Sequence, residues 1–267
     1  MSRPATPIEL ALTETATARK SSTVVLVRDA ANAPEFLMVQ RHAKSSLGDS
    51  YVFPGGVLDA SDHAVHEHCT GCTAEEADRV LGVAADGLDY FSAAVRELFE
   101  ETGVLLAHAE AAADDLQQAR DQLNDGSLRW DAFVTASNVR LKCDSLHYFS
   151  HWITPDILPQ RYSTRFFIAE LPAGQRAVHD GGELTDSCWM TADDVLLAGS
   201  KGSMSMRFPT LRTLESIAGH ESVEALVVWA KSIANAGVKC SHPQIVERDG
   251  VRRIVLDGAD GSTEVKP

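Results

Sequence analysis

Three glutamates, Glu97, Glu100 and Glu101, lie close together in the run RELFEETG, from Arg96 to Gly103. On an α-helix, positions i, i+3 and i+4 are neighbours, so this spacing gathers the three carboxylates on one side. Like charges in such positions repel one another, and only Arg96 relieves the repulsion locally. Because Mg²⁺ and Mn²⁺ prefer carboxylate oxygens, the run predicts a site for divalent metal; a solvated acidic helix face is the alternative.

A helix of roughly residues 90–102 must carry these acids. Its core-facing stripe repeats at i, i+4, i+7 and i+11 and consists of Phe91, Val95, Leu98 and Thr102. The acids then face outward. Asp89 is the expected N-cap, and Gly103 suits the left-handed position after the helix end.

Adjacent glycines lie upstream, in the run FPGGV of residues 53–57. They follow a short β-prone stretch, and without a Cβ they let the backbone approach a ligand or a metal closely. A glycine turn at this point therefore favours the metal interpretation over the solvated face.

The two runs together resemble the Nudix hydrolases, whose box reads Gly, five residues, Glu, seven residues, then Arg-Glu-U-x-Glu-Glu-x-Gly-U, where U is aliphatic. Gly56 matches the first glycine, and residues 96–104 match the second half. Asp62 stands where the family has Glu, and about 26 residues are inserted before Arg96. Because of this departure, Asp62 is given no role in the site.

The interrupted box is similar to that of the coenzyme A diphosphatase-related branch called the Nudix motif 19 type. Segments 151–155 and 159–167 are also similar to this branch, and the resemblance spans roughly residues 22–215. A signature found before the box in coenzyme A diphosphatases is only partly present: its first arginine aligns with Arg41, but its second falls on Ser46.

The resemblance implies Mg²⁺- or Mn²⁺-dependent hydrolysis of a diphosphate that links a nucleoside to another moiety. Coenzyme A or an acyl derivative, cut to 3',5'-ADP and a phosphopantetheine, is the leading substrate; ADP-ribose and NADH are competitors. The three glutamates and the Gly55 carbonyl would hold metal. Arg96 would orient the glutamates, and Glu183 or a box glutamate would take the proton from water, with Asp186 as the substitute for Glu183.

Basic residues that could hold phosphate lie in two places. Arg41 and Lys44 precede the glycine pair, and Arg161 and Arg165 lie four apart on an extended stretch, on the same face. Solvated surface arginines are the alternative. Nearby aromatic residues could stack on a base, but core packing is the more common use.

The insertion, about residues 63–88, is rich in metal-binding side chains: His63, His66, His68, Cys69 and Cys72. Thiolate and imidazole suit Zn²⁺. Because a second pair of ligands at regular spacing is missing, a polar surface loop is the preferred interpretation.

Composition limits the partners. A net charge of -14 argues against nucleic acid and anionic membranes, so a polyanionic substrate would need metal as a bridge. No apolar run reaches the length of a membrane span, and five scattered cysteines favour a reducing compartment, the cytoplasm. A small nucleotide is the expected partner, and a homodimer is left open.

The predicted fold is α/β, a Nudix fold with a mixed β-sheet between helices. Residues 1–20 are expected to be a flexible lead-in, residues 21–267 one domain, and residues 207–267 a helical C-terminal extension that ends in a hairpin. Strands are predicted at 23–28, 35–40, 51–53, 146–153, 164–171 and 187–190, a loop at 41–50, and helices at 108–124, 127–137, 192–197, after Pro209 and at 221–234.

Two other classes share this fold. A nucleotide sensor without turnover would not need a repulsive cluster of acids, so the three glutamates argue against it. A diphosphate isomerase would need an active-site cysteine, and no motif surrounds Cys143 or Cys188.

Overall fold

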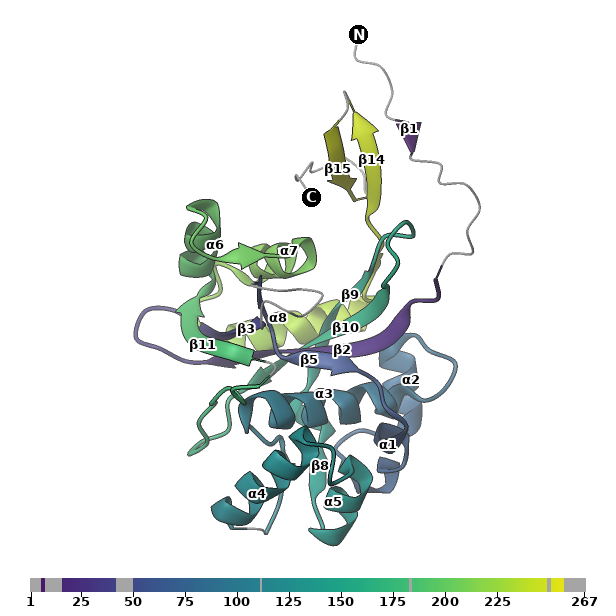
Figure 1. The fold of residues 1–267 in the computed structure, drawn as a ribbon, viewed down its shortest axis with the longest axis vertical. Coiled ribbons are helices and arrows are strands. Elements are labelled where there is room, and N and C mark those ends of the chain that lie inside the picture. Colours follow the sequence, from purple (N-terminus) through teal and green to yellow (C-terminus); the bar gives the residue numbers. More distant parts are fainter. Residues whose placement is uncertain are drawn as a thin grey trace.

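The structure is a computed structural model that describes residues 6–7, 16–41, 50–110, 112–182, 184–248 and 251–256. A mixed β-sheet crosses the middle of the molecule, and helices cover both of its faces (Figure 1). Its strand order is β12-β4-β3-β2-β10-β9-β13, with β11 paired to β3 and β5 paired to β2. The predicted α/β class, a mixed sheet between helices, is confirmed.

The strands are β1 (Thr6–Pro7), β2 (Arg19–Arg28), β3 (Glu35–Arg41), β4 (Ser50–Val52), β5 (Gly55–Val57), β6 (Cys69–Thr70), β7 (Ala107–His108), β8 (Arg140–Lys142), β9 (His147–Ile153), β10 (Tyr162–Glu170), β11 (Leu184–Thr191), β12 (Ser205–Met206), β13 (Cys240–Ser241), β14 (Gln244–Arg248) and β15 (Val251–Val255). The helices are α1 (Ala60–His63), α2 (Ala74–Leu81), α3 (Gly87–Thr102), α4 (Ala113–Asn124), α5 (Trp130–Ala136), α6 (Ala192–Ser200), α7 (Phe208–Ile217) and α8 (Val223–Ala236), with 3₁₀ turns η1 (His66–His68) and η2 (Cys143–Ser145).

Strand β2 is apolar on both faces because it separates two cores. Side chains alternate along a strand, so Val24 and Leu26 pack on the side of α3, while Val25 and Val27 pack on the side of α6, α7 and α8. The strand pairs in parallel with β10 and in antiparallel with β3. This central strand therefore fixes α3 against the sheet.

Most elements lie where local sequence signals predict them. β2 and β3 form the expected hairpin, Thr191 caps α6 through its side chain, and Pro209 lies in the first turn of α7. The terminal hairpin is β14 and β15. The predicted helix at 108–124 is shorter, because residues 107–108 pair with β8 as strand β7.

The insertion is not the polar loop that the sequence predicts. It contains η1, β6 and α2, and Val65, Ala77 and Leu81 lie in the core on the α3 side of the sheet. Thr73 and Glu76 form a capping box at the start of α2. A short sheet of β6, β8 and β7 ties the insertion to the rest of the domain.

The structure describes parts of the predicted C-terminal extension and of the predicted N-terminal lead-in. Helices α7 and α8 of the C-terminal extension belong to the layer that covers the second face of the sheet. Thr6–Pro7 pair with β14, and β2 begins at Arg19. The rest of the predicted lead-in up to residue 15, and residues 42–49 of the predicted loop, lie outside the described residues. In the described part, no helix is long and apolar enough to span a membrane.

Two histidines of β9 make stability depend on pH. Burial lowers the pKa of His147 and of His151 to about 4, whereas unfolded histidine titrates near 6.5. Between these values the unfolded chain binds protons that the folded protein does not, so stability falls as pH drops from about 6.5 towards 4. Allowing for partial solvent screening, we expect a loss of about 1 kcal/mol per histidine.

Urea denaturation at pH 7 and pH 5 measures this loss. His147→Gln and His151→Gln should each reduce the difference between the two pH values. His108→Gln, at an exposed position, should leave it unchanged. Equal stability of the wild-type protein at both pH values would contradict the assignment.

Candidate functional site

Helix α3 carries the glutamate run and is buried on nearly all sides. Phe91, Val95, Leu98 and Thr102 are buried as predicted, and the helix ends at Gly103, whose φ is +73° and whose N–H donates to the Phe99 carbonyl at 2.8 Å. The prediction that the three glutamates all face outward is wrong, because Glu101 is buried. Helix α3 also packs against β5 and α1.

The N-terminus of α3 also differs from the prediction. The N-cap is Asp86, and Asp89 lies in the first turn. The Asp89 carboxylate is engaged by His63 and His66 of the insertion instead of by the helix backbone. This tertiary contact could not be seen from the local sequence.

The glycine pair forms strand β5 and not a turn. Gly55 pairs with Thr23 and Gly56 with Ser22 of β2. A Cβ on Gly55 would lie 2.3 Å from the Ser22 carbonyl oxygen, and a Cβ on Gly56 would lie 2.3 Å from Oε1 of Glu97. Glycine is needed here because β5 lies against β2 on one side and against the Glu97 carboxylate on the other.

Arg96 lies under the site and holds two of the three glutamates. Its Nη1 donates to Glu97 Oε1 at 2.8 Å and to Glu100 Oε2 at 3.2 Å, and its Nη2 donates to the Val57 carbonyl at 2.9 Å. Arg96 is itself 7% exposed. A buried guanidinium therefore connects α3 to β5 and sets the position of the two carboxylates.

Asp62 completes this arrangement and is the residue that the sequence analysis left without a role. It is fully buried, and its two oxygens accept from Nε and Nη2 of Arg96, each at 3.0 Å. Ser92 donates to the same carboxylate. Burial raises the pKa of Asp62, whereas the guanidinium bonds favour its ionised form. The signal was its place six residues after Gly56, where the family has an acid.

Glu97 and Glu100 open onto a recess of about 380 Å³ between β5, α3 and α5. Arg19 at the start of β2 and Trp130 at the start of α5 also line it. The pKa of Glu100 is raised to about 7, mainly by burial and then by the charge of Glu97, against the lowering effect of Arg96. A carboxyl with such a pKa can hold or release a proton near neutral pH.

Glu101 lies apart from this pair, beside the backbone of β5. Its Oε2 accepts from the Gly55 N–H at 2.8 Å, and Arg41 Nη2 donates both to Glu101 Oε1 at 3.2 Å and to the Gly55 carbonyl at 2.9 Å. The three glutamates thus form two groups: Glu97 with Glu100 at the recess, and Glu101 with the Gly55 carbonyl.

The other predicted site residues lie elsewhere. The buried Arg161 bonds to Asp156 and to the carbonyls of Thr154 and Ala16. Arg165 stacks on Tyr90, with Cζ 4.2 Å from the ring centroid. Neither arginine lines the recess. Nearby Phe166 and Phe167 serve the core.

Lys44 and Glu183 lie outside the described residues. Asp186, the substitute for Glu183, accepts from the Tyr51 hydroxyl at 3.4 Å in β11.

The donor set fits a hard divalent cation. Glu97, Glu100, Glu101 and the Gly55 carbonyl offer oxygen atoms alone, which suits Mg²⁺ or Mn²⁺. A guanidinium nitrogen of Arg41 already lies between the Gly55 carbonyl and Glu101, so this pair of oxygens attracts positive charge.

The comparisons with known proteins agree with this fold. The crystal structure of a NUDIX hydrolase from Alicyclobacillus acidocaldarius superposes with a TM-score of 0.65 and 25% sequence identity, over 79% of this chain and 96% of that one. The chain thus has a Nudix hydrolase fold. The model of the NUDT19 Nudix domain matches residues 73–215, and the chain belongs to this family.

A curated relative is the acyl-coenzyme A diphosphatase NUDT19 of Xenopus laevis, which is 25% identical over 204 residues, 61% of this chain and 54% of the relative. The match therefore spans about half of that protein's length. The comparisons confirm the resemblance to the Nudix motif 19 type and the predicted class of protein, a Nudix hydrolase.

Proposed function

We propose that the protein hydrolyses the diphosphate of a nucleoside diphosphate linked to another moiety, with Mg²⁺ or Mn²⁺ as cofactor. The observation that carries the proposal is the pair of carboxylates, Glu97 and Glu100, held at an open recess by the buried Arg96. An acidic site attracts a polyanionic substrate only through a cation, so these carboxylates and a phosphate imply metal between them.

We further propose that the substrate is coenzyme A or acyl-coenzyme A, with 3',5'-ADP and (acyl-)phosphopantetheine as products. The family and the name of the amphibian relative support this choice. ADP-ribose and NADH remain the competing substrates. Because the described cysteines are all free thiols, we place the reaction in a reducing compartment, the cytoplasm.

In this proposal the chain supplies binding, orientation and proton transfer. Glu97 and Glu100, and Glu101 with the Gly55 carbonyl, would hold the metal, which when bound neutralises phosphate charge and lowers the pKa of water. Arg96 orients Glu97 and Glu100, and Asp62 orients Arg96. Glu100 or Glu183 accepts the proton from the attacking water; the raised pKa of Glu100 supports its candidacy.

Arg19 is the residue of the recess that we expect to contact phosphate. It is exposed at the start of β2 and lines the recess with the two glutamates. Arg19→Ala should raise KM about 10–100-fold and change kcat little. A guanidinium bond to a phosphate contributes about 1.5–3 kcal/mol, and it stabilises the bound substrate and the transition state equally.

Lys20→Ala is the matched control, since Lys20 is the next residue of the strand and points to the other face. Steady-state kinetics of both variants decide the assignment. A KM of Arg19→Ala equal to that of Lys20→Ala would remove Arg19 from the substrate site.

The reaction is tested with purified protein and Mg²⁺ or Mn²⁺ against coenzyme A, acyl-coenzyme A, ADP-ribose and NADH, with products identified by mass. We expect coenzyme A or its acyl derivative to be cut fastest, and turnover to stop in EDTA. Faster cleavage of ADP-ribose or NADH would correct the substrate and keep the reaction. Absence of turnover with all four would contradict the proposed function.

A further inference from the structure

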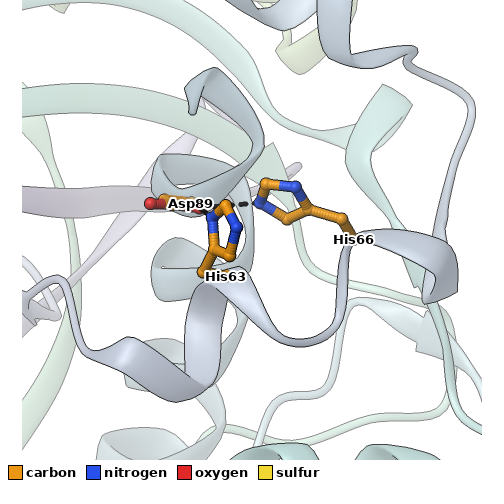
Figure 2. Close-up of side chains that lie close together, drawn as sticks. All are labelled: His63, His66 and Asp89. Atoms are coloured by element: carbon orange, nitrogen blue, oxygen red, sulfur yellow. Dashed lines mark hydrogen bonds and ion pairs between the residues drawn. The ribbon is translucent and has the colours of Figure 1, made fainter. Parts of the chain in front are cut away.

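Two histidines of the insertion and one aspartate of α3 form a cluster outside the recess. His63 Nδ1 lies 3.1 Å and His66 Nε2 lies 2.7 Å from the same oxygen of Asp89. Figure 2 shows both rings turned towards the Asp89 carboxylate, His63 from the end of α1 and His66 from the segment that follows it. We propose that these three residues bind a divalent transition metal, Zn²⁺ in the first place, and so fasten the insertion to α3.

The distances suit one ion. The three ligand atoms lie within 4.8 Å of one another, and in the described part of the chain no other group of three His, Cys, Asp or Glu side chains does so. Zn²⁺ in a tetrahedral site keeps its ligands about 3.3 Å apart, since Zn–N bonds are about 2.0–2.1 Å. The two imidazole nitrogens lie 3.1 and 2.7 Å from the Asp89 oxygen, close to this spacing, and within 4.8 Å of each other.

Two of the three side chains are largely buried, and the third is exposed and can move. The side chains of Asp89 and His66 are 17% and 25% exposed, whereas that of His63 is 60% exposed and can take up the small movement. Asp86 lies near His63, with an oxygen 3.8 Å from its Nδ1, but it does not belong to the group whose ligand atoms all lie within 4.8 Å of one another, so water would complete the site.

The ligand chemistry separates this site from the recess. Two imidazoles and one carboxylate suit Zn²⁺ and its neighbours, whereas the oxygen ligands at the recess suit Mg²⁺ or Mn²⁺. The cysteines of the insertion are not part of the cluster, and His68 is bound instead to the Val139 carbonyl. The inference therefore narrows the histidine- and cysteine-rich zinc site considered from the sequence to a His-x-x-His pair completed by Asp89.

The cluster lies next to the contact between Asp62 and Arg96. His63 directly follows Asp62, which bonds to Arg96, and Asp89 lies two turns before Arg96 on the same helix. A metal at this point would fix the two segments whose contact positions Arg96. The inference concerns metal binding alone and does not depend on the proposed reaction.

The test is a titration of the full chain, stripped of metal with a chelator, with Zn²⁺ or Co²⁺ in excess Mg²⁺. Wild-type protein should bind one equivalent of Zn²⁺. Co²⁺ bound at the same site should show the visible absorption of tetrahedral coordination. The double variant His63→Ala with His66→Ala should bind more than about 100-fold more weakly, since even the loss of an outer partner of a metal ligand costs about 10–100-fold.

Two control variants and one further ligand variant show which residues bind the ion. His108→Ala removes an exposed histidine elsewhere and should bind as wild type. Glu97→Gln with Glu100→Gln weakens the recess and should retain the Zn²⁺ site. Asp89→Asn keeps the size of the side chain and should weaken binding without unfolding the protein.

Wild-type affinity in the double histidine variant, or no Zn²⁺ bound by the wild-type protein, would overturn the inference. Loss of binding only in the double glutamine variant would place the ion at the recess instead and would also overturn it.

Discussion

Glu100→Gln is expected to lower turnover by about 10²–10³-fold while making the metal-free protein more stable at pH 8. The loss follows because glutamine cannot supply a charged oxygen to metal or accept a proton, and interactions of this kind contribute about 3–4 kcal/mol to the transition state. Glu97→Gln should reduce turnover to a similar extent, because both carboxylates bond to the same Arg96 nitrogen at the recess.

The gain in stability follows from the pKa of Glu100. This pKa is raised to about 7 in the folded protein, whereas unfolded glutamate titrates near 4.3. Between these values the folded protein holds a proton that the unfolded chain has lost, so stability falls as pH rises towards 7. Glutamine stays neutral, and we expect a gain of about 1–3 kcal/mol at pH 8 without metal.

Kinetics and urea denaturation in EDTA measure the two effects separately. Glu110→Gln, at an exposed position outside the site, should alter neither. Wild-type turnover in Glu100→Gln would remove Glu100 from the reaction. Lower stability of this variant at pH 8 would show that the folded protein favours ionised Glu100.

Asp62→Ala is expected to cost about 3–5 kcal/mol of folding free energy, because it removes the fully buried carboxylate from a buried ion pair with Arg96. Asp62 is fully buried and accepts two bonds from Arg96 at 3.0 Å. Asp62→Asn retains one acceptor oxygen and should cost less. In both variants we expect a lower kcat even where the protein is folded, since Arg96 then holds Glu97 and Glu100 less firmly.

Thermal or urea denaturation measures the loss of folding free energy. Kinetics at temperatures or urea concentrations well below the unfolding transition measure the change in kcat. Asp115→Ala on the exposed side of α4 is the control and should change stability by no more than about 0.5 kcal/mol. An Asp62→Ala variant as stable as the control would contradict the buried pair.

Local patterns predicted the elements whose causes are local. The apolar stripe of α3 follows from the helical period, its end from the left-handed Gly103, and the start of α6 from the Thr191 cap. The short connection between β2 and β3 likewise made the hairpin evident from the sequence alone.

The site was predicted in part, and the failures have a common cause. The sequence places Glu97 and Glu100 on one helix face, but the Asp62–Arg96 pair joins residues 34 positions apart across an insertion. Helical spacing also grouped Glu101 with the other two, whereas the Gly55 N–H and Arg41 draw it towards β5. Such contacts depend on how elements pack, and neither period nor capping signals encode them.

The central claim is that Glu97 and Glu100 hold a divalent cation at the recess. Anomalous diffraction from crystals soaked in Mn²⁺ tests it most directly. We predict a Mn²⁺ peak in contact with a carboxylate oxygen of Glu97 or Glu100, lost in the Glu97→Gln, Glu100→Gln double variant. Saturating Mn²⁺ that leaves the recess empty, or peaks only at sites away from both glutamates, would contradict the claim.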